Sequence, residues 1–157
     1  MPALMTAEEL SHFLNEVFPQ VSGDFAIDHV GDGEVTVRLM TQDRHLRPGG
    51  TISGPSMFAL ADVAAYIVTL AMIGPKALAV TTNCSIDFMR KPRSGVDLIA
   101  KAAFQEVAAK MAVGFAMAVG FAMADDGFDG RSPPQLSFDL AMDTALLARS
   151  EDPSRLQ

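Results

Sequence analysis

A single acidic residue interrupts the longest apolar segment of the chain. Asp62 lies near the middle of the stretch from Pro55 to Ile73, which is apolar on nearly every side when drawn as a helix. Carboxylates are uncommon in protein interiors and need partners there. Asp62 is therefore either a structural carboxylate held by a neighbouring donor, or a general base or nucleophile whose pKa is tuned by apolar surroundings.

The glycine directly before this segment is the second residue whose type suggests chemistry. Proline favours the first position of a helix, so Pro55 predicts that Gly54 is the helix cap. The Gly54 N–H, together with the partial positive charge of a helix N-terminus, is suited to binding a developing oxyanion. A cap without any part in catalysis is the alternative.

The spacing of the two residues restricts how they can cooperate. Gly54 and Asp62 are eight residues apart, which is about 12 Å along a helix that rises ~1.5 Å per residue. A carboxylate and an oxyanion donor must both lie within about 3 Å of one reacting carbonyl group. If both residues act, Gly54 of one subunit must work with Asp62 of another, and the active site requires a dimer.

The segment from 55 to 73 predicts a helix that ends at Gly74 and Pro75. A helix this apolar is either a transmembrane span or a core helix surrounded by the rest of the protein. Asp62 at the middle of a bilayer would cost about 2.5–3.5 kcal/mol, and no cluster of Lys or Arg flanks the segment. These features favour a buried helix in a soluble protein and no membrane partner.

Capping residues and apolar periodicity predict the remaining elements. Thr6 and Glu9 have the spacing of a capping box, and one apolar stripe continues to Phe18, so a helix is expected over 6–18. Alternating apolar and polar residues predict strands. The expected strands cover residues 34–40, 77–91, 96–110, 111–126 and 136–143.

A hexapeptide, MAVGFA, occurs twice in tandem at 111–116 and 117–122. Because six is an even number, a strand keeps the large side chains on one side and only Ala and Gly on the other. The large side is expected to pack on the long helix, and the smooth side against a second sheet or another subunit. A local duplication without function is the alternative.

These elements indicate an α+β fold in which one antiparallel sheet wraps around one long central helix. The chain is expected to form a single domain over 1–148, with an N-terminal helix at 6–18, the central helix at 55–73 and a polar tail at 149–157. A sheet covers such a helix on one side only. A second copy of the chain is expected to cover the rest, in a dimer or a dimer of dimers.

Composition excludes several classes of function. The 157 residues include 12 basic and 19 acidic ones, and the net charge of −7 argues against a nucleic-acid binder. Cys84 is the only cysteine, and no Cys/His cluster has the spacing of metal ligands. The N-terminus lacks a basic segment followed by an apolar run, so no signal peptide is expected, and the protein is expected to be cytoplasmic.

The run GTISGPSMFALADVA, residues 50–64, resembles the signature of hotdog-fold acyl-CoA thioesterases of the phenylacetate-pathway (PaaI) type. In that family a loop ending in His-Gly-Gly opens the central helix, and an acidic residue sits eight positions after the first glycine. Here Ser53, Gly54 and Pro55 stand at the His-Gly-Gly positions and Asp62 at the acidic one. The segment TTNCSIDFMRKP is similar to the strand that follows, and the resemblance covers roughly residues 25–125.

The resemblance implies a reaction and roles for two residues. The family hydrolyses acyl-CoA thioesters to a carboxylic acid and free CoA, and it needs no metal or organic cofactor. The glycine N–H binds the thioester carbonyl, while the acidic residue of the partner subunit activates water or attacks directly. Gly54 and Asp62 match these roles. A hotdog dehydratase would need a catalytic histidine on the central helix, where none lies.

Two positions depart from the family pattern. Ser53 replaces the histidine, and Arg47 stands where many relatives carry an asparagine that helps to orient water. Both are still expected near the substrate. They also motivate a different class of function, a catalytically weak acyl-CoA-binding hotdog protein.

Further candidates are polar or basic residues within the second predicted strand or directly after it. One group is a basic cluster that is expected either to meet the CoA phosphates or to lie in a solvated turn: Arg90, Lys91 and Arg93. A second group offers polar atoms near the expected acyl pocket: Thr81, Thr82 and Asn83. His45, in the loop before the long helix, is expected at the surface, with a position close to the site as the alternative, and Cys84 is expected in the core.

Overall fold

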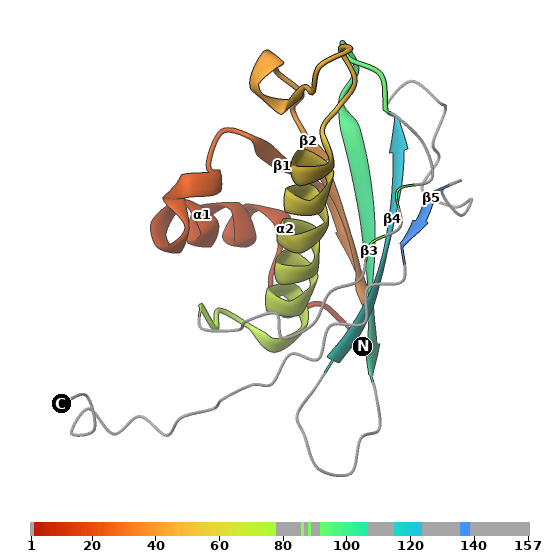
Figure 1. Cartoon of the computed structure of the whole chain (residues 1–157). Helices are drawn as coiled ribbons and strands as arrows, with labels where there is room; N and C mark the ends of the chain where they lie inside the picture. The colour runs from red at the N-terminus through yellow and green to blue at the C-terminus, as the bar shows by residue number, and fades with distance from the viewer. Residues whose placement is uncertain are drawn as a thin grey trace, which may run out of the picture.

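The computed structural model describes residues 2–77, 86, 88, 92–106, 115–123 and 136–138. One five-stranded antiparallel sheet and two α-helices make up the described part of the chain (Figure 1). In chain order the elements are α1 (Ala7–Val17), a 3-10 turn η1 (Pro19–Val21), β1 (Phe25–Gly31), β2 (Glu34–Leu39), a 3-10 turn η2 (Asp43–His45), α2 (Gly54–Ile73), β3 (Leu98–Glu106), β4 (Phe115–Met123) and β5 (Leu136–Phe138).

The strands lie in the order β1-β2-β3-β4-β5, and α2 runs along one face of this sheet (Figure 1). The face toward α2 is set by alternation along β2, where Val35 and Val37 are fully buried and Thr36 between them is not. The register continues this face across the sheet, because Val37 pairs with Ala100 and Ala100 with Phe121. The predicted arrangement of an antiparallel sheet around one long helix is confirmed.

The register of β4 also tests which side of the hexapeptide repeat faces the helix. Val119 pairs with Ala102, which in turn pairs with the buried Val35. Gly120 pairs with Lys101, which lies in line with Thr36 on the opposite face. Within 115–123, the register therefore puts Val119 in line with the helix-facing positions of β2 and β3 and Gly120 in line with the outer-face positions, the alternation that the even spacing predicts.

The outer face of the sheet is polar where β1, β2 and β3 meet. The Arg38 guanidinium lies 2.8 Å from a carboxylate oxygen of Asp28 and 3.4 Å from one of Asp97. The hydrogen bonds from Arg38 to these carboxylates, that to Asp28 above all, raise its pKa. Lys101 Nζ lies 3.1 Å from Glu34 Oε2 on the same face. These pairs are about one-third exposed, so solvent screens them and they contribute little to stability.

The strand β1 has no alternating signature in the sequence, because a β-bulge breaks its two-residue period. Ile27 pairs with Val37, but the register then shifts and Val30, three residues later, pairs with Val35. Asp28 lies in the bulge and is exposed. The apolar residues of β1 therefore do not alternate along the sequence.

The two helices begin at side-chain caps. At α1 the predicted capping box is present: the Glu9 N–H donates to Thr6 Oγ1, and the Thr6 N–H donates to the Glu9 carboxylate. At α2 the expected cap is wrong by one residue. Ser53 is the N-cap, and Gly54 is the first residue of the helix. Serine takes this position because its hydroxyl accepts a first-turn N–H, which glycine cannot do.

The helix α2 is long and apolar enough to cross a membrane by length and composition, with a mean hydropathy of 1.9 over its best window. Inside the protein, however, 67% of that window is buried. Leu60, Ile67 and Leu70 are fully buried against the sheet side. These contacts are those of a core helix.

Some predicted elements lie partly or wholly outside the described residues. Among these are most of the strand expected at 77–91 and the tail at 149–157. The first repeat copy is described only in its last two residues, and the last predicted strand only over Leu136–Phe138.

Candidate active site

The N-terminus of α2 has one amide that is left for a ligand. The Ser56 N–H donates to Ser53 Oγ at 3.3 Å, and the Met57 N–H donates to the Ser53 carbonyl at 3.1 Å. Pro55 has no N–H. Among the described residues the Gly54 N–H has no acceptor, as is usual for the first residue of a helix. The positive end of the α2 dipole is therefore available to a ligand through the Gly54 amide.

An aromatic ring lies beside Gly54. A Cβ atom placed on Gly54 would be 3.5 Å from Cζ of Phe88 and 3.7 Å from its Cε1. The Phe88 side chain is 52% exposed, so its ring forms a wall beside Gly54 rather than part of the core. Nothing in the sequence marks Phe88 as a site residue, because a phenylalanine in a predicted strand is ordinarily a core residue.

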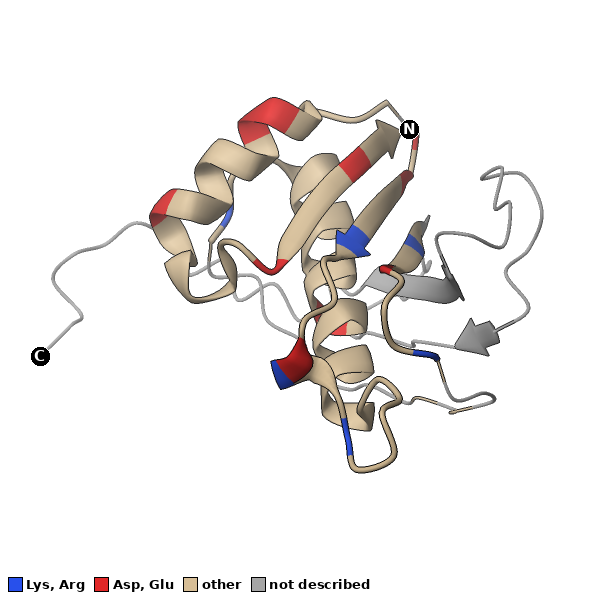
Figure 2. Ribbon diagram, turned by 90° about the horizontal axis from the view of Figure 1, so that it is seen from above, with Lys and Arg blue, Asp and Glu red and all other residues tan. Residues whose placement is uncertain are grey.

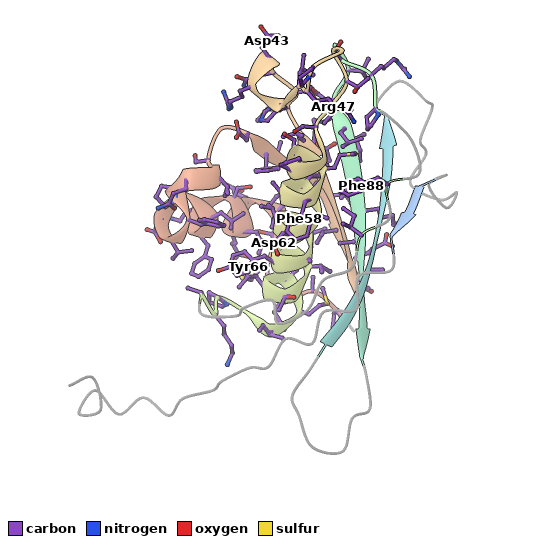
Figure 3. All side chains as sticks on the ribbon, viewed as in Figure 1. Asp43, Arg47, Phe58, Asp62, Tyr66 and Phe88 are labelled. Atoms are coloured by element: carbon purple, nitrogen blue, oxygen red, sulfur yellow. The ribbon has the colours of Figure 1, made fainter. Side chains whose placement is uncertain are left out.

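The loop before α2 is fixed by a hairpin. Leu46 and Ile52 form an antiparallel bridge, and the Arg47 N–H donates to the Thr51 carbonyl at 2.9 Å. The tip consists of Gly49 and Gly50, whose φ angles of +99° and +80° favour glycine. The Arg47 side chain is exposed at one side of this hairpin (Figure 3).

A second arginine reaches the same hairpin from another part of the chain. Arg93 forms an antiparallel bridge with Thr51, and the Ile52 N–H donates to the Pro92 carbonyl at 2.9 Å. The backbones of Arg47 and Arg93 are thus both joined to Thr51, three residues before Gly54. Viewed from above, basic residues occur in the loop leading into α2, whereas α1 carries only acidic charges (Figure 2).

His45 is buried, and the prediction that it lies at the surface is wrong. Its side chain is 9% exposed, its Nδ1 accepts the Gln42 N–H at 2.9 Å, and its carbonyl accepts the Ser53 N–H at 2.8 Å. The polarity and loop position of this residue suggested exposure. The 3-10 turn η2 instead folds the imidazole inward, where its Nε2 lies 3.6 Å from a carboxylate oxygen of Asp24, the residue directly before β1.

Asp62 lies on the side of α2 that the sheet does not cover. Phe58, Asp62 and Tyr66 follow one another at four-residue spacing along this face (Figure 3). Phe58 is 40% exposed, and Asp62 and Tyr66 are half-buried. The Tyr66 hydroxyl donates to the Ala77 carbonyl at 3.0 Å, and burial raises the pKa of Tyr66.

The structure keeps the two candidate catalytic groups of one chain apart. Gly54 begins α2 and Asp62 lies in its third turn, about 12 Å away along the axis. Of the substrate-binding candidates, Ser53, Arg47 and Arg93 lie around the start of α2. The other candidates lie outside the described residues: Thr81, Thr82, Asn83, Cys84, Arg90 and Lys91. In the described part of the chain, no group of three or more His, Cys, Asp or Glu residues could hold a metal ion.

Comparisons with known proteins agree with this architecture. A family model described as the Thioesterase superfamily matches residues 49–117, which include Gly54 and Asp62. A candidate thioesterase from Silicibacter sp. TM1040 is 42% identical and aligns over 91% of this chain and 94% of its own, with a TM-score of 0.75.

Two more distant structures share the fold. Zebrafish thioesterase superfamily member 2 is 14% identical over 90% of this chain and 99% of its own, with a TM-score of 0.71. The PaaI protein of the Escherichia coli phenylacetic acid degradation operon is 19% identical over 87% and 94%, with a TM-score of 0.61. No curated protein sequence matches the chain. Together the matches confirm the expected hotdog fold.

Proposed function

Because the chain belongs to the thioesterase superfamily, we propose that it hydrolyses acyl-CoA thioesters to a carboxylic acid and free CoA. The observation that carries this proposal is the Gly54 N–H at the start of a buried helix, for which the described residues offer no acceptor. Ser53 uses the next two amides of the helix, so the dipole of α2 acts on a ligand through this donor.

The Gly54 N–H binds the thioester carbonyl oxygen. Negative charge grows on that oxygen as the carbonyl carbon becomes tetrahedral, so a fixed donor stabilises the transition state more than the ground state. The Phe88 ring, which lies beside Gly54, limits the access of water to this hydrogen bond. Exclusion of water strengthens the electrostatic interaction.

Asp62 of a second subunit supplies the reacting carboxylate. As a base it takes a proton from water, whose oxygen attacks the carbonyl carbon; the C–S bond then breaks and the CoA thiolate takes up a proton. As a nucleophile it forms an acyl anhydride and expels the thiolate, and water then hydrolyses the anhydride. Both routes give the same products, and the roughly 12 Å between the two groups on one helix requires a second chain in either case.

The exposed side of α2 is the surface that the second subunit covers in this proposal. Phe58 is an apolar side chain left 40% exposed, and it stands one turn before Asp62. A two-fold axis beside this face brings the Asp62 of each chain toward the α2 N-terminus of the other. The proposed assembly is thus a homodimer, or a dimer of dimers, with two equivalent sites.

The two arginines beside Thr51 are proposed to hold the CoA phosphates. Arg47 and Arg93 are exposed, and their backbones are joined through Thr51. Guanidinium groups bind phosphate oxygens in pairs of charge-assisted hydrogen bonds. This position is three residues before Gly54, so the nucleotide would bind at the mouth of the site and the thioester beside Gly54.

The alternative is an acyl-CoA-binding protein with little turnover. It is favoured by Ser53, whose hydroxyl is engaged with the Ser56 N–H and with Ser56 Oγ at 2.9 Å. A serine in this role caps the helix but supplies no imidazole. Saturable acyl-CoA binding without product release would establish this second function.

The decisive experiment measures free-thiol release from a panel of acyl-CoAs. Asp62→Asn is expected to lower kcat by about 10²–10⁴, the range for a lost general base. The control is Asp32→Asn, which changes an exposed aspartate in a turn and should leave kcat unchanged. Undiminished hydrolysis by Asp62→Asn would contradict the role of Asp62. Absence of hydrolysis by a folded wild type that binds acyl-CoA would favour the binding function.

Complementation tests the need for two subunits. A Gly54→Pro chain lacks the donor and an Asp62→Asn chain lacks the carboxylate, so each homodimer is inactive. A mixed dimer contains one intact site, and equal mixing with exchange of subunits restores about a quarter of the wild-type activity. No recovery, with subunit exchange verified, would place both groups of a working site in one chain.

A further inference from the structure

A buried histidine connects the hairpin before α2 to the residue that caps the helix. His45 Nδ1 accepts the Gln42 N–H at 2.9 Å, and the His45 N–H donates to the Gln42 carbonyl at the same distance. These two bonds close the turn η2. The His45 carbonyl in turn accepts the Ser53 N–H at 2.8 Å, and Ser53 precedes the Gly54 amide.

We propose that His45 is a positioning residue, which in its neutral form holds Ser53 in place and thereby keeps the Gly54 N–H aimed at the substrate carbonyl. Its role in turnover rests on the function proposed above, whereas its effect on the geometry of Gly54 does not. Two hydrogen bonds connect Gln42 to Ser53 through His45. The Gln42 N–H donates to His45 Nδ1, and the Ser53 N–H donates to the His45 carbonyl.

The hydrogen bond at Nδ1 fixes the protonation state that this role requires. The Gln42 N–H is a donor, so Nδ1 must present a lone pair and the neutral ring carries its proton on Nε2. Nε2 lies 3.6 Å from Asp24 Oδ2. A proton added at Nδ1 would face the Gln42 N–H, donor against donor, and open the turn that carries the His45 carbonyl.

The charged groups that face the imidazole are Asp24 and Arg44. Arg44 forms an ion pair with Asp24, so the carboxylate is already neutralised by a cation next to the ring. Burial lowers the pKa of His45 below the ordinary value of 6.5, and repulsion by Arg44 lowers it further. The neutral ring is therefore favoured at pH 7, and its protonation needs a lower pH than that of an ordinary histidine.

Because the pKa of His45 is lowered in the folded protein, stability and kcat should both decrease as the pH falls. A histidine whose pKa is lower in the folded state stabilises the fold above its unfolded-state value, and that contribution is lost as the pH falls. We expect kcat to fall on the acid side of pH 6.5 together with the neutral fraction of His45, about tenfold for each pH unit below its pKa. KM should change much less, because Arg47 and Arg93, which are proposed to bind the CoA phosphates, stay charged and in place.

The first test needs no activity. The ring protons of His45 and the amide resonance of Gly54, assigned by its loss in Gly54→Pro, are followed by NMR in wild type from pH 8 to pH 5. The Gly54 amide is expected to shift with the midpoint of the His45 ring. A Gly54 amide that is indifferent to this titration would overturn the proposal.

The second test uses matched variants. His45→Asn offers Oδ1 as a non-titrating acceptor in place of Nδ1, and it should keep most of the wild-type kcat at pH 7.5 and lose the acid-side decline. His45→Leu has no acceptor and should lower kcat about tenfold, the cost of about 1.4 kcal/mol of misplacement. His12→Asn changes an exposed histidine on α1 and should copy the wild-type profile. A purely structural role would instead lower the stability of both His45 variants and leave the pH profile of the folded enzyme unchanged.

The two tests separate this inference from the proposed function. If no acyl-CoA is hydrolysed at any pH but the Gly54 amide follows His45, the thioesterase function fails and the coupling stands. If hydrolysis is found and kcat of His45→Leu equals that of wild type, the function stands and the positioning role is overturned.

Discussion

Replacing Gly54 by proline removes the one hydrogen-bond donor on which the proposed chemistry depends. Ser53 has φ −72° and ψ 152°, the extended conformation that a residue before proline adopts. Gly54 is the first residue of α2, where proline fits and where its missing N–H costs the helix nothing. Gly54→Ala is the matched control, because it adds a side chain but keeps the N–H.

The structure indicates how each substitution should affect the free energy of unfolding and kcat. The added Cβ would stand 3.5 Å from the Phe88 ring, an ordinary van der Waals distance, so the Cβ that both variants add leaves this ring in place. Both substitutions reduce the freedom of the unfolded chain, whereas Pro55 disfavours the helical conformation for a residue before it that carries a Cβ. The two effects on the free energy of unfolding oppose each other and act on both variants alike. Loss of one oxyanion donor costs about 2.7–4 kcal/mol, so kcat of Gly54→Pro should fall by about 10²–10³.

The assay compares kcat and KM for thiol release by wild type and both variants, with thermal unfolding as the check on folding. The expected result is a stable but nearly inactive proline variant beside an alanine variant that keeps most of the activity. Equal losses in the two variants would mean that contact with Phe88, and not the N–H, sets the rate. A proline variant within about threefold of the alanine variant would refute the role of Gly54 as oxyanion donor.

Two further predictions concern the residues around this donor. Ser53→Ala removes the cap of α2 at a cost of about 1 kcal/mol, so Tm should fall by about 2–4 °C in differential scanning calorimetry. The Gly54 N–H remains, so kcat should change little. A large loss of kcat without loss of Tm would give Ser53 a direct part in the reaction. Arg93→Gln should raise KM for an acyl-CoA about tenfold, the effect of one charge-assisted contact, and leave KM for the same acyl group on pantetheine, which lacks the nucleotide phosphates, unchanged; equal effects on both thioesters would place Arg93 away from the CoA phosphates.

The sequence predicts the helices and most of the described sheet because their signals are local. The capping box of Thr6 and Glu9 and the alternation along β2 need no knowledge of distant residues. The same local signals do not predict β1, because the bulge after Ile27 is defined only by its pairing with β2. The cap of α2 was placed one residue late, since glycine and serine are both common at that position.

The sequence predicts the candidate site only for residues that belong to the same helix. Gly54 and Asp62 belong to α2, so their separation followed from the rise of a helix. His45 and Phe88 reach the helix N-terminus through the turn η2 and through a distant segment, and nothing in their own neighbourhoods marks this. Burial of a loop histidine depends on the whole fold, which a single sequence does not display.

Hydropathy alone does not determine which side of α2 meets the sheet, because apolar residues occupy both sides. Leu60 is fully buried while Phe58, two positions earlier, is 40% exposed. In a protein whose α2 faced only water on that side, polar residues would cost nothing at the exposed positions, and an apolar patch there would promote association. The exposed apolar side therefore argues for a covering surface. The roughly 12 Å between Gly54 and Asp62 argues independently that the missing half of the site comes from another chain. One surface meets both needs, so a variant that separates the proposed subunits should lose activity even when both groups are intact.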